Sequence, residues 1–142
     1  MGLMQFFPSL TKKHYFYLVA LIILYLSTRI YNLTSLPIFV DEAIYSRWSQ
    51  IALHDASWRF ISLTDGKQPL WVWLSMAPLK LISDPLYATR LTSVLAGLVG
   101  MLGLVYSGFL LKSLRLGLLA ATLYILTPFL FFMIVLPRWN PC

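Results

Sequence analysis

The chain has few charged residues, and the acidic ones are the scarcest. Of its 142 residues 11% are charged, and only five are acidic: Asp41, Glu42, Asp55, Asp65 and Asp84. The chain is 59% hydrophobic and its mean hydropathy is +0.76, which is typical of a membrane protein and not of a soluble domain. Because all five acids fall in one stretch, this stretch marks where water meets the bilayer.

Other features that the sequence lacks narrow the functional classes. Its single cysteine, Cys142, excludes an intramolecular disulfide framework. It has no Gly-rich phosphate loop, no zinc-ligand spacing and no nucleophile elbow, and its two histidines are isolated from each other. The net charge of +6 does not predict nucleic-acid binding, because the basic residues are scattered. A basic surplus is usual for an inner-membrane protein that obeys the positive-inside rule.

Hydropathy predicts an all-α integral membrane protein with three transmembrane helices, at about 15–33, 90–111 and 116–136. We interpret the first as a signal anchor and not a signal peptide, because its apolar core is long and no small-residue cleavage site precedes Arg29. The second follows a helix-start signal, Ser83-Asp84-Pro85. Its small residues permit close helix packing: Ser93, Gly97, Gly100, Gly103 and Ser107.

The segment between the first two spans, residues 34–89, is predicted to be an outer loop that carries two amphipathic interfacial helices. The first, at about 42–54, has an apolar face with helical spacing, formed by Ile44, Trp48, Ile51 and Ala52. Arg47, Ser49 and Gln50 lie between these positions and form its polar side. The second, at about 69–82, opens with a proline and is too short for a span, which needs about 20 residues.

The distribution of basic residues predicts the topology. Lys12 and Lys13 precede the first span, and Lys112 and Arg115 lie between the second and third. The positive-inside rule places these residues in the cytoplasm and the acidic loop outside. The sequence therefore predicts a multi-pass cell-membrane protein whose N-terminus is cytoplasmic.

Three features of the outer loop allow a chemical and a structural interpretation. Asp41, directly before Glu42 at the membrane interface, could act as a partly desolvated base or could simply cap the helix that begins there. Lys67, after the turn dipeptide Asp65-Gly66, could bind a lipid phosphate or extend its amine to the headgroups. The loop's four tryptophans indicate an aromatic belt more than a platform for sugars: Trp48, Trp58, Trp71 and Trp73.

Three blocks of the sequence, in this order and with this hydropathy, carry a resemblance to a known family. The first is Pro37-x-x-x-Asp41-Glu42-Ala43-x-Tyr45. The second is Asp65-Gly66-Lys67-Gln68-Pro69-Leu70-Trp71-x-Trp73-Leu74, and the third is Ala88-x-Arg90-Leu91-x-Ser93-x-Leu95-Ala96-Gly97. Over about residues 10 to 130 the chain resembles the start of a polytopic glycosyltransferase of the C-type fold. The nearest resemblance is to the dolichyl-phosphate-mannose–protein mannosyltransferase-like family and the lipid A aminoarabinose transferases.

The resemblance implies an enzyme that transfers a sugar, with inversion, from a polyprenyl-phosphate carrier to a hydroxyl of a lipid, glycan or protein acceptor outside the cytoplasm. It implies that Asp41 activates the acceptor hydroxyl and that Glu42 supports the site or holds a divalent metal, the one cofactor that it suggests. Lys67 matches a lysine that faces the carrier phosphate, and Arg90 opens the second span as in the family. Two positions depart from the pattern. Gln68 replaces the first proline of the family's Lys-Pro-Pro-Leu block, and Gly66 stands where the aminoarabinose transferases have a glutamate.

Members of this family are several times longer, so the resemblance makes us expect an N-terminal fragment that transfers no sugar by itself. We also expect the last ten or so residues to come from a frameshifted or truncated reading frame, because the family carries an aromatic-Asp-Arg motif at this place. Two other classes remain open. A small non-enzymatic membrane subunit would not need the acid pair, and a transporter fragment would carry polar residues inside its spans, of which the second and third have almost none.

Overall fold

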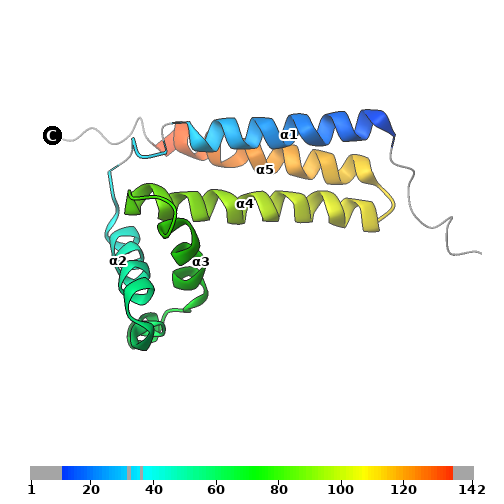
Figure 1. Cartoon of the computed structure of the whole chain (residues 1–142). Helices are drawn as coiled ribbons and strands as arrows, with labels where there is room; N and C mark the ends of the chain where they lie inside the picture. Colours follow the sequence, from blue (N-terminus) through cyan, green and yellow to red (C-terminus); the bar gives the residue numbers. More distant parts are fainter. Residues whose placement is uncertain (1–10, 32, 36, 136–142) are drawn as a thin grey trace, which may run out of the picture. The chain divides into compact units, whose positions relative to one another are not determined.

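The computed structural model describes residues 11–31, 33–35 and 37–135, with side chains as far as Thr127. This part of the chain is all-helical and contains no strand, as the sequence predicts (Figure 1). The described residues divide into two compact units, one within the ranges 1–28 and 97–142 and the other within the range 29–96. The tail expected from a shifted reading frame falls on residues 133–142, of which 136–142 lie outside the described residues.

Five α-helices lie close to the predicted positions, and two short 3₁₀ helices were not predicted. The α-helices are α1 (Lys12–Ile30), α2 (Val40–His54), α3 (Leu70–Leu79), α4 (Pro85–Leu110) and α5 (Leu114–Val135). The 3₁₀ helices η2 (Ala56–Trp58) and η3 (Ile61–Asp65) connect α2 to α3. Sequence periodicity does not reveal such short pieces, because they contain about one turn each.

The start of α4 follows the signal in the sequence. The Asp84 carboxylate accepts hydrogen bonds from the backbone N–H groups of Leu86 (2.9 Å) and Tyr87 (3.3 Å). Pro85 occupies the first helical position, where its missing N–H costs nothing. The other end of α4 closes with Lys112 in the left-handed region (φ 57°) and a hydrogen bond from Ser113 N–H to the Gly108 carbonyl (3.0 Å). This geometry is a Schellman motif, which usually places glycine where Lys112 stands.

Within the described residues, α4 is the one helix that is both long and apolar enough to cross a membrane. The helix α1 has 19 residues, but Lys12, Lys13 and Arg29 near its ends lower its mean hydropathy. The helix α3 and the stretch Leu114–Thr127 of α5 are apolar but shorter. Three membrane spans therefore remain a prediction.

The first unit brings α1, the second half of α4 and α5 together around a glycine. The rings of Tyr25 and Tyr124 stack with their centroids 6.4 Å apart, and both hydroxyls lie against Gly97. A Cβ on Gly108 would lie under 3.0 Å from the backbone of Gly117, so α4 and α5 touch through two glycines. The prediction of close packing is confirmed at Gly97. The approach of one helix backbone to another, at Gly108 and Gly117, involves two glycines that were not among the predicted small residues.

In the second unit, α2 packs on α3 through small side chains. The fully buried residues of α2 are Ser46, Ser49 and Ala52, and those of α3 are Val72 and Ser75. The face of α2 that packs on α3 differs from the predicted apolar face, whose contact with the membrane stays a prediction. Of its four members only Ala52 is fully buried, whereas Ser49, assigned to the polar side, is completely covered. Small side chains let the two helices come close, and this steric gain decides which face turns inward.

Candidate active site

The first turn of α2 presents two neighbouring carboxylates in different roles. The helix begins at Val40 with Phe39 as its N-cap residue, and Glu42 Oε2 accepts a hydrogen bond from Phe39 N–H (3.4 Å). This is the reciprocal half of a capping box, and the Phe39 side chain has no acceptor to supply the other half. The interpretation of Asp41 as the helix cap is therefore wrong, because Asp41 lies inside the first turn and Glu42 takes the capping role.

Glu42 also forms an ion pair with Arg90 of α4. Arg90 Nε donates to Glu42 Oε1 (2.6 Å) and a terminal nitrogen of Arg90 donates to Oε2 (2.8 Å), which makes the pair bidentate. The other donors of the guanidinium reach the backbone carbonyls of Leu33 (2.8 Å) and Pro37 (3.3 Å). Arg90 therefore ties the segment before α2 and the first turn of α2 to the start of α4.

The contact with Arg90 favours the ionised form of the Glu42 carboxyl. Hydrogen bonding to Arg90 lowers the pKa of the Glu42 carboxyl, and the charge of Arg90 and the Phe39 N–H act in the same direction against partial burial. The side chains of Arg90 and Glu42 are 11% and 25% exposed. A bidentate pair with this little solvent contact keeps Glu42 ionised and fixes its orientation.

Lys67 lies between two other acids of the loop, Asp41 and Asp65. Its Nζ is 3.3 Å from Asp41 Oδ1 and 3.3 Å from Asp65 Oδ2. The chain reaches this geometry through Gly66, which adopts the left-handed region (φ 67°) at the end of η3, and through a hydrogen bond from Lys67 N–H to the Ser62 carbonyl (3.0 Å). The turn interpretation of Asp65-Gly66 is confirmed, and the turn is also what brings Lys67 to Asp41.

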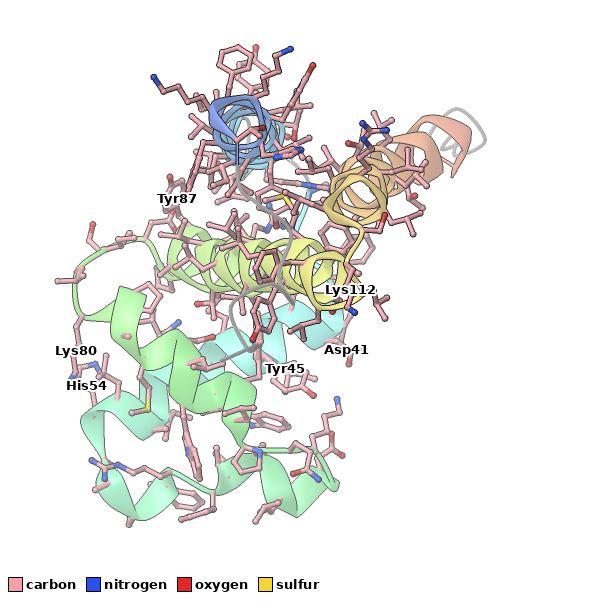
Figure 2. The ribbon with its side chains drawn as sticks, turned by 90° about the vertical axis from the view of Figure 1, so that its right-hand side faces the viewer. Asp41, Tyr45, His54, Lys80, Tyr87 and Lys112 are labelled. Atoms are coloured by element: carbon pink, nitrogen blue, oxygen red, sulfur yellow. The ribbon has the colours of Figure 1, made fainter. Side chains whose placement is uncertain are left out.

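Two aromatic rings of α2 complete the surroundings of Lys67. Its Nζ lies 5.2 Å from the ring centroid of Tyr45 and 5.8 Å from that of Trp48, and the two rings meet edge to face. Asp41 and Tyr45 lie one turn apart on α2 (Figure 2). The sequence does not predict that these rings contact Lys67. It does place Asp41, Tyr45 and Trp48 on one helix face, because they are at positions i, i+4 and i+7.

The charge of Lys67 is favoured in this setting. Partial desolvation acts against the ammonium, but the hydrogen bonds to Asp41 and Asp65 outweigh it, so the pKa of Lys67 is raised above its usual range. Asp41 is less enclosed than expected, because its side chain is 80% exposed. Partial desolvation of Asp41 would therefore have to come from the membrane interface and not from neighbouring side chains, and it stays a prediction.

The four predicted site residues thus form two pairs, Asp41 with Lys67 and Glu42 with Arg90. Among the described residues no group of three His, Cys, Asp or Glu side chains lies together as a metal site. Both oxygens of Glu42 are occupied by Arg90, so a divalent metal at Glu42 would have to displace the guanidinium. A separate hydrogen bond links α3 to the segment between η2 and η3, because Trp73 Nε1 donates to the Arg59 carbonyl (2.7 Å).

Comparison of the chain with models of protein families, with curated proteins and with solved structures found no match.

Proposed function

We propose that the chain belongs to a membrane glycosyltransferase that takes a sugar from a polyprenyl-phosphate carrier and transfers it, with inversion, to an acceptor hydroxyl outside the cytoplasm. The observation that supports this most is the juxtaposition of Asp41 and Lys67, which are 26 residues apart in sequence and 3.3 Å apart in space. This displacement needs a base on one face of the sugar and a cation on the other, so the two neighbouring side chains must separate to admit the anomeric carbon between them.

Each member of this pair has one role in the proposed reaction. The acceptor oxygen attacks the anomeric carbon from the face opposite the phosphate, and the Asp41 carboxylate accepts the proton of the acceptor hydroxyl. The bond between the anomeric carbon and the phosphate oxygen breaks, and both its electrons remain on the leaving polyprenyl phosphate. Lys67 stabilises this charge as a point cation.

The salt bridge between Asp41 and Lys67 connects donor binding to base activation. While Lys67 contacts Asp41, the ammonium occupies the carboxylate that the acceptor hydroxyl must reach. A carrier phosphate next to Lys67 competes for the ammonium and thereby frees Asp41. Because the Asp41 side chain is 80% exposed, this exchange requires no opening of a packed core.

Glu42 and Arg90 contribute by positioning in this proposal. The bidentate pair fixes the first turn of α2, in which Asp41 is the residue before Glu42. The predicted substrate-binding roles of Glu42 and Arg90 would require them to leave partners that already satisfy them. Their direct contact with substrate stays a prediction.

We propose further that α1, α4 and α5 span the cell membrane, with a cytoplasmic N-terminus. Only 22% of the most apolar window of α4 is buried, and large side chains such as Leu95 (47% exposed) and Val99 (69% exposed) are only partly covered. A core helix of a soluble protein would be mostly buried, whereas a lipid-facing helix would not. Cysteine labelling in a Cys142→Ser background tests this topology. An outside reagent should reach Asp55→Cys and Asp65→Cys but not Lys12→Cys or Ser113→Cys; labelling of Ser113→Cys would contradict three spans.

Binding of the carrier tests the function without requiring turnover. The purified chain in detergent micelles is titrated with a polyprenyl phosphate and, separately, with the uncharged polyprenol, and tryptophan fluorescence is followed because Trp48 lies beside Lys67. We expect the phosphate to bind about tenfold more tightly than the alcohol, a difference of roughly one charge-assisted hydrogen bond.

The matched variants are Lys67→Met and Lys80→Met, which remove the same charge from two places in the same unit. Lys67→Met should abolish the preference for the phosphate, whereas Lys80→Met, at the exposed end of α3, should keep it. Equal binding of phosphate and alcohol by the unchanged chain would refute the proposal and favour a non-enzymatic membrane subunit.

A further inference from the structure

A second group of polar side chains surrounds an open hollow at the other end of α2, away from Asp41. The hollow has a volume of about 340 Å³ and is lined by Arg47, Gln50, Ile51, His54, Asp55 and Trp58. Asp41 and His54 lie in the first and last turns of α2 (Figure 2). Thirteen helical steps of about 1.5 Å place them about 20 Å apart. The hollow is therefore a different place from the site formed by Asp41 and Lys67, which we call the Lys67 site.

The spacing along α2 turns one row of side chains toward the hollow. Arg47, Gln50, Ile51 and His54 are at positions i, i+3, i+4 and i+7, which share a helix face. Arg47, Gln50 and the ring of His54 supply N–H donors, and Ile51 supplies an apolar wall. This end of the hollow is therefore suited to an anionic oxygen group.

The opposite end of the hollow has the opposite polarity. Asp55 Oδ1 accepts hydrogen bonds from Ser57 N–H (2.9 Å) and Ser57 Oγ (2.7 Å), and these bonds lower the pKa of the Asp55 carboxyl. The carboxylate is therefore ionised at neutral pH. Trp58 adds a half-exposed indole ring, whose face attracts cations. An ammonium group fits this end.

The polar side chains that line the hollow do not satisfy one another's hydrogen-bonding groups. In the described part of the chain, the side chains of Arg47, Gln50 and His54 make no hydrogen bond or ion pair with protein, and Arg47 does not pair with Asp55. Arg90, by contrast, has acceptors for Nε and for both terminal nitrogens. Because Arg47 and Asp55 line one hollow but do not form an ion pair with each other, the hollow suits a ligand that carries both a negative and a positive charge.

We propose that this hollow binds a phosphoethanolamine-type group, with its phosphate at Arg47, Gln50 and His54 and its ammonium at Asp55 and Trp58. The volume is at the lower end of the range for small-ligand sites, about 300 to 1,000 Å³, which suits a headgroup better than an extended glycan. A purely anionic group would meet the Asp55 carboxylate. The proposal does not depend on sugar transfer, because it uses none of the residues of the Lys67 site.

The test compares lipids that share their acyl chains and differ in the headgroup. The full chain in detergent micelles is incubated with palmitoyl-oleoyl phosphatidylethanolamine or phosphatidylglycerol, and retained lipid is counted by native mass spectrometry. We expect phosphatidylethanolamine to be retained about two- to fivefold more, the effect of one solvent-exposed charge contact. Soluble O-phosphoethanolamine is then added as a competitor. Displacement shows that a free phosphoethanolamine group suffices, and its absence shows that the site takes the headgroup only as part of a lipid.

Two variants address the ends of the hollow separately. Asp55→Asn keeps an oxygen for the Ser57 hydrogen bonds but removes the charge, so it should abolish the preference for phosphatidylethanolamine. Arg47→Gln should lower the retention of both phospholipids. The control is Asp84→Asn, which removes the same charge at another helix-capping position that asparagine can also fill. Circular dichroism confirms that the variants keep their helices.

Three results of the retention experiment would overturn the proposal. They are equal retention of the two lipids by the unchanged chain, stronger retention of phosphatidylglycerol, and an Asp55→Asn variant that behaves like the unchanged chain. Displacement of phosphatidylethanolamine by methyl α-mannoside but not by O-phosphoethanolamine would also overturn it, and would assign the hollow to a sugar.

Discussion

Asp41 and Glu42 are neighbours in the sequence, but each pairs with a cation in a different way. Glu42 forms two short hydrogen bonds with Arg90, of 2.6 and 2.8 Å, and both side chains are mostly covered. Asp41 makes a single contact of 3.3 Å with Lys67, which also contacts Asp65, and the two carboxylates are 80% and 58% exposed. The first pair is fixed by geometry, whereas the second can exchange its partners.

This difference shows which pair suits a binding site. A guanidinium that already holds a carboxylate and two backbone carbonyls gains little from a ligand, and it loses those bonds if it moves. A lysine between two exposed carboxylates loses little when it turns to a phosphate, because exposed ion pairs are weak. We therefore regard Lys67 as the centre of the proposed site and Arg90 as the residue that positions the first turn of α2.

The largest effect should come from breaking the fixed pair. Arg90→Met leaves the Glu42 carboxylate and two backbone carbonyls without their donor, and we expect it to lower the free energy of unfolding by about 3 kcal/mol. Denaturant titration in mixed micelles, followed by circular dichroism, measures this loss. Arg59→Met removes an arginine from the same unit at an exposed position and should change little.

A double variant separates the pair from the fold around it. Arg90→Met with Glu42→Leu removes both charges, so no uncompensated carboxylate remains, and it should recover part of the stability that Arg90→Met loses. If the double variant is as unstable as Arg90→Met, the carbonyls of Leu33 and Pro37 are the important partners and the pair is not.

A smaller effect, about 1 to 2 kcal/mol, should appear when acid titrates Glu42. The pKa of Glu42 is lowered in the folded chain, so its contribution to stability is complete above the ordinary value of 4.5 and is lost as the pH falls through the lowered value. The stability difference between the unchanged chain and Glu42→Gln should therefore be constant above about pH 5 and shrink below pH 4.5. A difference that stays the same in acid would mean that the charge of Glu42 does not matter.

The smallest effect should come from removing a partner of Lys67. Asp65→Asn leaves Lys67 with one carboxylate, so the ammonium is freer for a phosphate, and polyprenyl phosphate should bind about two- to fivefold more tightly. Asp41→Asn should strengthen this binding in the same way while it removes the proposed base. The fluorescence titration described for the carrier measures both variants, with Asp84→Asn as a control outside the pair. Weaker binding in Asp65→Asn would mean that Asp65 orients Lys67 and does not compete with the phosphate.

The helices of this chain could be predicted because their signals are local. A long apolar run, the capping Asp84 and Pro85 indicate α4 without reference to any other part of the chain. The site could be predicted only in part. The blocks that resemble a known family named Asp41, Glu42, Lys67 and Arg90, but nothing local says which acid meets which base. The spacing of Tyr45 and Trp48 placed them on the face of Asp41, yet their contact with Lys67 depends on the turn at Gly66.

By itself the sequence determined the helical class, the helix positions and the confinement of acids to one segment, because composition, periodicity and capping act over a few residues. Only the tertiary structure decided that α2 buries Ser46, Ser49 and Ala52 and leaves the larger Ile44, Trp48 and Ile51 partly exposed, because small side chains allow the close approach of α3. It also decided that Glu42 pairs with Arg90, 48 residues away, and Asp41 with Lys67, 26 residues away. A carboxylate attracts any cation, so its partner is set by which cation the fold brings within hydrogen-bond distance.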